Sequence, residues 1–143
     1  MDVPMYTSVS SRSAAAYKRV GTQTSVDGAS PHQLICLLYE ALLQSLRLAH
    51  AATIRGDIET KGKEIGKSVR ILEEGLKAAL NDAAGGELAT NLRGVYNYSI
   101  SRLTRANINN DAPMINEVIE LVIPVYGAWK SIATPGQAAA SRV

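Results

Sequence analysis

The sequence predicts an all-α protein, an antiparallel up-down-up-down four-helix bundle. Ala, Leu, Ile and Val dominate its apolar residues, Phe is absent and aromatic residues make up only 5% of the chain, a composition that favours helices. Apolar residues recur at helical spacing in four segments between residues 30 and 133. The links between these segments are short, which makes neighbouring helices antiparallel. A chain of 143 residues is long enough for one such domain with its own core.

The predicted bundle is flanked by two segments without helical periodicity. Residues 1–29 are rich in Ser, Thr, Ala and Gly, and we expect a flexible arm with one short helix over residues 13–20. The bundle itself is expected over residues 30–133. Residues 134–143 are expected to form a loose tail.

The first helix has a capping signal and an unusually wide apolar surface. Ser30, Pro31 and Gln33 occupy the N-cap, first and third helical positions of a capping box, and Gly56 marks the end after Arg55. One apolar stripe consists of Leu34, Leu38, Ala41, Leu48 and Ala52, and a second of Ile35, Tyr39, Leu42, Leu46 and Ala49. A bundle helix usually needs only one stripe. The second is therefore expected to be covered by the arm, an oligomer or a client, unless the helix is deeply buried.

The second and third helices are also predicted from a start or stop signal and an apolar face. Asp57 is a suitable N-cap for a helix ending near Asn81. Its apolar positions are Ile58, Ile65, Val69, Leu72, Leu76, Ala79 and Leu80. After Gly85-Gly86, a third helix is expected from Glu87 to about Asn109. Its core face is predicted to contain Leu88, Leu92, Val95, Ser99, Leu103 and Ala106.

The fourth helix begins after Asp111, with Pro113 in its first turn, where proline is tolerated. Its apolar face is Ile115, Val118, Ile119, Val122, Tyr126 and Trp129. Pro124 removes one backbone hydrogen bond and is expected to kink this helix.

Charge and cysteine content indicate a cytoplasmic protein without a nucleic-acid partner or membrane insertion. The 15 basic and 13 acidic residues give a net charge of +2, which is too balanced to imply either partner. The single cysteine, Cys36, cannot form an intrachain disulfide and suits a reducing compartment. Residues 1–11 lack the apolar stretch of a signal peptide, and no run approaches the ~20 apolar residues that span a bilayer.

The residue spacings do not match the known motifs for metal binding or phosphate binding. A di-iron bundle needs Glu three residues before His, but Ala29 precedes His32 and Arg47 precedes His50 at that distance. Gly62 and Gly66 imitate a phosphate-binding loop, but three residues separate them instead of four and no strand precedes them. The sequence therefore predicts neither an enzyme nor a cofactor.

Two tyrosines of the third helix instead suggest binding. Tyr96 and Tyr98 lie two residues apart, so their side chains diverge by about 200° on a helix. One is expected to pack in the core while the other lines a groove with its hydroxyl in water. An ordinary tyrosine at the boundary of the core is the alternative.

Several segments together resemble one known family. Ala16-Tyr17-Lys18, Ser30-Pro31-His32-Gln33-Leu34-Ile35 and Leu37-Leu38-Tyr39-Glu40-Ala41-Leu42 resemble the N-terminal signature of the flagellin export chaperones, the FliS family. Gly86-Glu87-Leu88-Ala89 and Asn91-Leu92-Arg93-Gly94-Val95-Tyr96-Asn97-Tyr98 resemble its third-helix signature, and Arg102-Leu103, Ala106-Asn107, Asp111, Glu117-Val118 and Trp129 follow in order. The resemblance covers roughly residues 14 to 130.

The resemblance implies a helical bundle whose client is the disordered C-terminal region of flagellin. The client would be kept from polymerising and delivered to the flagellar type III export gate. The residues then expected to contact it are Tyr17 on the arm and Ile35, Tyr39, Leu42, Leu46, Asn91, Tyr96, Tyr98 and Arg102 in the bundle. Asn97, where aspartate is usual, and Pro124 with Gly127 depart from the family pattern. The alternative function is a regulatory adaptor that binds a folded partner, such as an anti-sigma factor or an export component.

Overall fold

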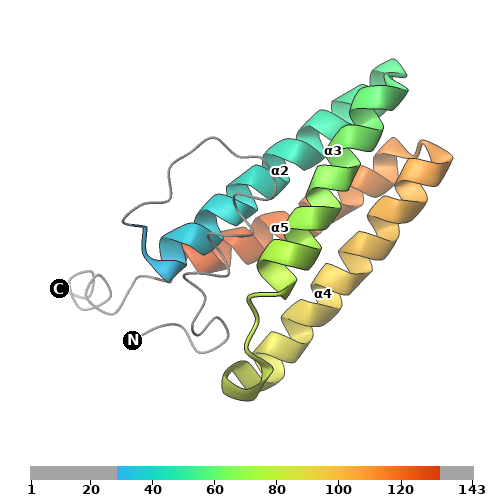
Figure 1. Ribbon diagram of the computed structural model, residues 1–143. Helices are drawn as coiled ribbons and strands as arrows, with labels where there is room; N and C mark the ends of the chain where they lie inside the picture. Colours follow the sequence, from blue (N-terminus) through green and yellow to red (C-terminus); the bar gives the residue numbers. More distant parts are fainter. Residues whose placement is uncertain (1–28, 133–143) are drawn as a thin grey trace.

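A computed structural model describes residues 29–132, and within them every regular element is helical (Figure 1). The elements are α2 (Pro31–Arg55), α3 (Ile58–Arg70), the π-helix η2 (Ile71–Lys77), α4 (Asp82–Asn109) and α5 (Ala112–Ser131). Because η2 continues α3, these elements form four rods, and Figure 1 shows successive rods running in opposite directions. The predicted all-α bundle is confirmed. The predicted short helix over residues 13–20, the predicted tail and all of the predicted arm except residue 29 lie outside the described part.

Most helix ends form where the sequence predicts them, but the predicted start of the third helix at Glu87 was wrong: α4 begins at Asp82, with Asn81 as its N-cap, and Gly86 interrupts it instead of preceding it. The Ser30 hydroxyl accepts a hydrogen bond from the Gln33 backbone N–H at 3.1 Å, and the Ser30 N–H donates to the Gln33 side chain at 2.8 Å. Gly56 ends α2 with φ of 76°, a left-handed conformation that glycine adopts without a steric penalty. Asp57 and Asp111 cap α3 and α5 through their carboxylates. These contacts satisfy backbone groups that would otherwise lack partners.

The second rod departs from the predicted regular α-helix. Its last seven residues, Ile71–Lys77, form a π-helix, in which residues five apart come close to the same face. This explains why Ile71 and Leu76 both have no exposed surface, although an α-helix would separate them by about 140°. At the other end, the prediction that Ile58 is part of the apolar face was wrong, because it lies in the first turn of α3 and is 57% exposed.

Helix α2 supplies residues to most of the core. Both of its predicted stripes are largely buried, and it contacts α3, η2 and α5. Leu48 is an exception, because it is 45% exposed on the outer side of α2. By length and composition alone α2 could cross a membrane, but half of its most apolar stretch is buried inside the bundle. The sequence expectation overlooked this helix because polar residues interrupt its apolar ones.

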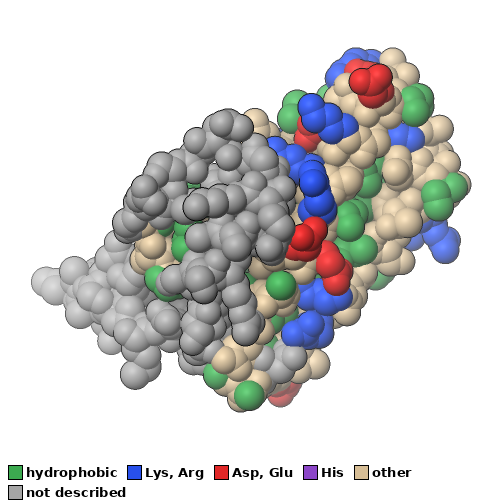
Figure 2. Space-filling view, viewed as in Figure 1, with side chains coloured by type: hydrophobic (Ala, Val, Ile, Leu, Met, Phe, Trp, Pro, Cys, Tyr) green, Lys and Arg blue, Asp and Glu red, His purple; other side chains and the backbone are tan. Residues whose placement is uncertain are grey.

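Helix α5 continues through Pro124 as far as Ser131. On the face that Figure 2 shows, basic and acidic side chains lie interspersed over α3. Lys61 of α3 is an exception in being buried, and its ammonium donates to the Asn107 carbonyl and to the Asn110 side chain at the end of α4. A cation at a helix C-terminus is favourable there because the helix dipole is negative.

Candidate functional site

An apolar hollow of about 330 Å³ opens at one end of the bundle, between α2, α4 and α5. It is lined by Tyr39, Leu88, Leu92, Pro124, Val125, Ala128, Trp129 and Ile132. Leu88 and Ile132 are 54% and 40% exposed, so two large apolar side chains face solvent at its rim. Leu92 and Trp129 are buried beneath them. Large exposed apolar side chains gathered around a concave surface are typical of a binding site for a partner.

Trp129, which lines the hollow, is held against α2 by its contacts with His32. The Trp129 indole N–H donates to the His32 carbonyl at 3.2 Å, and His32 Nε2 lies 2.9 Å from the Trp129 carbonyl oxygen, to which it donates. The two rings stack with centroids 4.9 Å apart. Residues 97 positions apart are thereby held together, so the end of α5 has a fixed place against the start of α2.

Tyrosines lie beneath and beside the hollow. Tyr39 and Tyr96 are both buried, and their hydroxyl oxygens lie 2.5 Å apart across the bundle. The Tyr126 ring lies 5.7 Å from the Tyr39 ring, and its hydroxyl donates to Glu40 at 2.5 Å. Burial and this contact with Glu40 raise the pKa of Tyr126 well above its ordinary value, so Tyr126 remains a neutral donor. These contacts fix the α2 side of the site.

A second polar group lies on the α4–α5 seam, at the surface. The Tyr98 hydroxyl donates to Glu117 at 2.6 Å, and Arg102 Nε donates to the other oxygen of the same carboxylate at 2.8 Å. The Arg102 guanidinium also lies 5.8 Å from the centroid of the Tyr98 ring. The hydrogen bond from Tyr98, followed by that from Arg102, lowers the pKa of Glu117. Tyr98 is 45% exposed but held in one orientation.

The predicted client-contact residues that the structure describes fall into four groups. Tyr39 and Tyr96 meet in the core, while Tyr98 and Arg102 meet at the surface, as the divergence of Tyr96 from Tyr98 predicts. Asn91 is exposed on α4. Ile35, Leu42 and Leu46 have no exposed surface, so contact with a client would require them to become exposed. Tyr17 lies outside the described residues.

Sequence reasoning missed most of the hollow. Leu88 was predicted to be a core residue, which is wrong. It lies two residues after Gly86, whose non-helical backbone interrupts α4 at the open end of the bundle. Pro124, Ala128 and Ile132 were not recognised, because a hollow formed by three helices depends on how they pack. The one signal available in the sequence was Pro124 itself, a proline within an apolar helical segment.

The chemistry of the site is that of apolar contact. Among residues 29–132, no three His, Cys, Asp or Glu side chains lie close enough together to hold a metal ion. Cys36 is half-buried near Trp129, and burial raises the pKa of its thiol, which keeps it protonated. The hollow offers surface for binding.

Comparison with known proteins agrees with this description. The family model "Flagellar protein FliS" matches residues 13–136. The flagellar secretion chaperone FliS of Salmonella typhimurium is 42% identical over 118 residues, which cover 82% of this chain and 87% of the relative. FliSB of Pseudomonas aeruginosa is 41% identical over 82% of this chain and 92% of its own, and FliS of Bacillus subtilis is 37% identical over 76% and 79%. The chain belongs to the FliS family, which is a family of flagellar export chaperones and not of enzymes.

Proposed function

We propose that this chaperone binds the C-terminal segment of flagellin in the apolar hollow, in the cytoplasm. Binding keeps the segment from polymerising before export and brings it to the flagellar type III export apparatus. The relatives from Salmonella and Pseudomonas are named flagellar secretion chaperones, which supports a flagellar protein as the client. The observation that carries the proposal is the hollow itself, where Leu88 and Ile132 stay exposed beside buried Trp129.

An extended or disordered client needs apolar surface of this kind. Fixing the backbone of each client residue costs about 1–2 kcal/mol in conformational entropy. Apolar contact returns about 25 cal/mol for each Å² removed from water, so one small contact could not hold the client. The hollow supplies side chains from three helices, and an amphipathic helix of the client could place its apolar face there.

The walls of the hollow are ordered before the client arrives. The contacts of Trp129 with His32, and of Tyr126 with Glu40, hold α5 against α2. Little of the binding free energy is then needed to order the chaperone side. Tyr39, for which the family resemblance implies contact with the client, lies at the buried base of this hollow.

The test compares three ligands in a binding titration: full-length flagellin, flagellin lacking its C-terminal segment, and the isolated segment. The proposal expects the first and third to bind with similar affinity and the truncated protein not to bind. The proposal would be overturned if truncated flagellin bound as tightly as full-length flagellin. It would also be overturned if the chaperone bound a folded regulator and did not bind flagellin. Delivery is tested separately, by whether an export-gate component retains the flagellin-bound chaperone and not the empty one.

A further inference from the structure

The last turns of α5 supply half of the hollow's lining. Four of the residues that line it come after Pro124 in the chain: Val125, Ala128, Trp129 and Ile132. Pro124 has no backbone N–H, so the carbonyl of Glu120 lacks the donor that an α-helix would supply. The missing hydrogen bond makes α5 less rigid at this point. The position of the hollow's α5 side therefore depends on contacts that lie beyond Pro124.

His32 makes such contacts at the far end of this segment. Its Nε2 and the Ile132 backbone N–H both donate to the carbonyl oxygen of Trp129, at 2.9 and 3.1 Å. The Trp129 indole N–H donates to the His32 carbonyl, and the two rings stack. Figure 1 shows the end of α5 beside the start of α2, where this His32–Trp129 contact lies. One side chain of α2 thus holds Trp129 and, through a shared carbonyl, the backbone of Ile132 at the rim.

A second link between α5 and α2 lies nearer to Pro124. The Tyr126 hydroxyl donates to Glu40 at 2.5 Å, and the Lys130 ammonium lies 5.0 Å from the centroid of the Tyr126 ring. This link holds the turn that precedes Trp129. The last turn, with the rim residue Ile132, is held by the His32–Trp129 contact.

We propose that His32 is a positioning residue of the client site, which keeps the α5 side of the hollow in the conformation that binds. His32 is not among the residues that line the hollow, so it acts through Trp129. The inference rests on the proposed binding of the flagellin segment in the hollow. Without the His32–Trp129 contact, the last turn of α5 samples several positions and only a fraction of the molecules is ready to bind. The apparent affinity falls in proportion to that fraction.

Three variants separate the hydrogen bond from the ring contact. His32→Ala removes both, His32→Gln keeps an N–H donor at the end of the side chain, and His32→Phe keeps an aromatic ring to stack on Trp129. In a calorimetric titration of the full chain with the isolated flagellin segment, His32→Ala should raise Kd at least about fivefold, because both interactions are lost. His32→Gln and His32→Phe should each recover part of the affinity.

Trp129 reports on the same contact directly, because it is the only tryptophan of the chain. Its indole is buried in the wild type. In His32→Ala the indole gains access to water, so its emission maximum should shift to longer wavelength before any client is added. The shift should be largest for His32→Ala and smaller for the other two variants, in the same order as their Kd values. Helical circular dichroism should change little, since only one turn is released.

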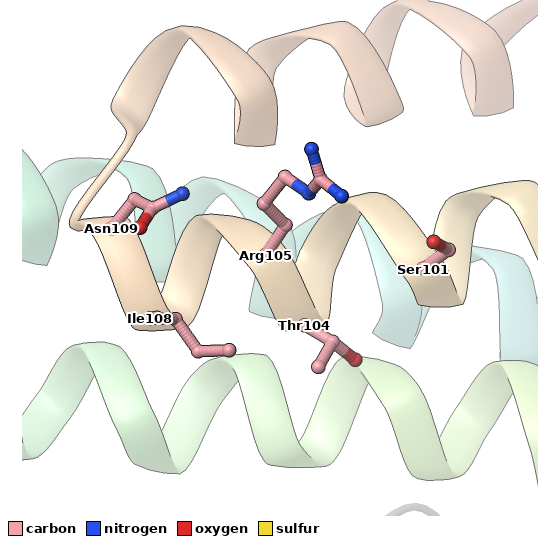
Figure 3. Close-up of a pocket in the computed structure, with 5 residues that line it drawn as sticks. All are labelled: Ser101, Thr104, Arg105, Ile108 and Asn109. Carbon is pink, nitrogen blue, oxygen red and sulfur yellow. The ribbon is translucent and has the colours of Figure 1, made fainter.

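Matched controls lie at the other end of the bundle. Asp57→Ala removes the N-cap of α3, which lowers stability without touching the hollow. Ile108→Ala changes a second hollow, of about 460 Å³, whose lining residues Ser101, Thr104, Arg105, Ile108 and Asn109 all belong to α4 (Figure 3). Neither variant should shift the Trp129 emission or change Kd by more than about twofold.

The proposal is overturned if His32→Ala binds the segment as tightly as the wild type, or if its Trp129 emission is unchanged. It is also overturned if Asp57→Ala weakens binding as much as His32→Ala, because general loss of stability would then explain both. Failure of the wild-type chain to bind the segment would overturn the proposed function, and this inference with it.

Discussion

Replacing Leu88 with alanine tests the hollow at its most exposed large side chain. Complete burial of a leucine side chain is worth about 1.5–3 kcal/mol. Leu88 is 54% exposed, so a client that covers it gains about half of this, roughly 0.8–1.6 kcal/mol. Alanine forfeits most of that gain, which corresponds to a flagellin affinity about four- to fifteenfold lower. The fold should be unaffected, because alanine is a better helix former than leucine at an exposed position.

The assay is isothermal titration calorimetry with the flagellin C-terminal segment, beside thermal melts of each variant. Leu48→Ala is the matched control, since Leu48 is 45% exposed on α2 and lies outside the hollow. It should leave the affinity within about twofold of wild type. The reasoning fails if Leu88→Ala binds as tightly as wild type, or if Leu48→Ala weakens binding equally.

Three further predictions concern the bundle. Lys61→Met should lower the free energy of unfolding by about 1–3 kcal/mol in denaturant, because the part-buried carbonyl of Asn107 loses the donor that buried Lys61 supplies. The same change at exposed Lys63 should be tolerated. Gly56→Ala should cost about 1–2 kcal/mol from its left-handed backbone alone, and Gly56→Asn less, in the same assay. Glu117→Gln should lower the melting temperature of the bundle at neutral pH. The lowered pKa of Glu117 means that this difference in melting temperature persists above the ordinary value of 4.5 and disappears as acid protonates the wild-type carboxylate; a difference unchanged in acid would contradict it.

The sequence predicts the helix boundaries well because their signals are local. Ser30 with Gln33, and Asp111, each satisfy backbone groups within one turn, so neighbouring residues suffice to locate them. The left-handed cap at Gly56 depends only on the backbone conformations that glycine can adopt, so this residue alone locates the end of α2. The π-helix after Arg70 was missed because Leu72, Leu76 and Ala79 also fit α-helical spacing, so the sequence pattern alone favours a continuous α-helix.

The candidate site could be predicted only in part, because its contacts join residues distant in the chain. The spacing of Tyr96 and Tyr98 predicts that one is buried and the other exposed, and the structure confirms this. It cannot predict that Tyr96 meets Tyr39, 57 residues away. Leu88 lies at helical spacing from core residues, yet its exposure depends on the interruption at Gly86 and on the end of α5.

Heat-capacity change on binding tests the central claim, apolar capture of the flagellin C-terminal segment, most directly. The measurement is calorimetric titration of the isolated segment into the full chaperone at several temperatures, repeated in a salt series. Burial of apolar surface in the hollow predicts a large negative heat-capacity change and a gain in helical circular dichroism. With a net charge of only +2, salt should weaken binding only modestly. A heat-capacity change near zero, with binding lost at moderate salt, would contradict the account.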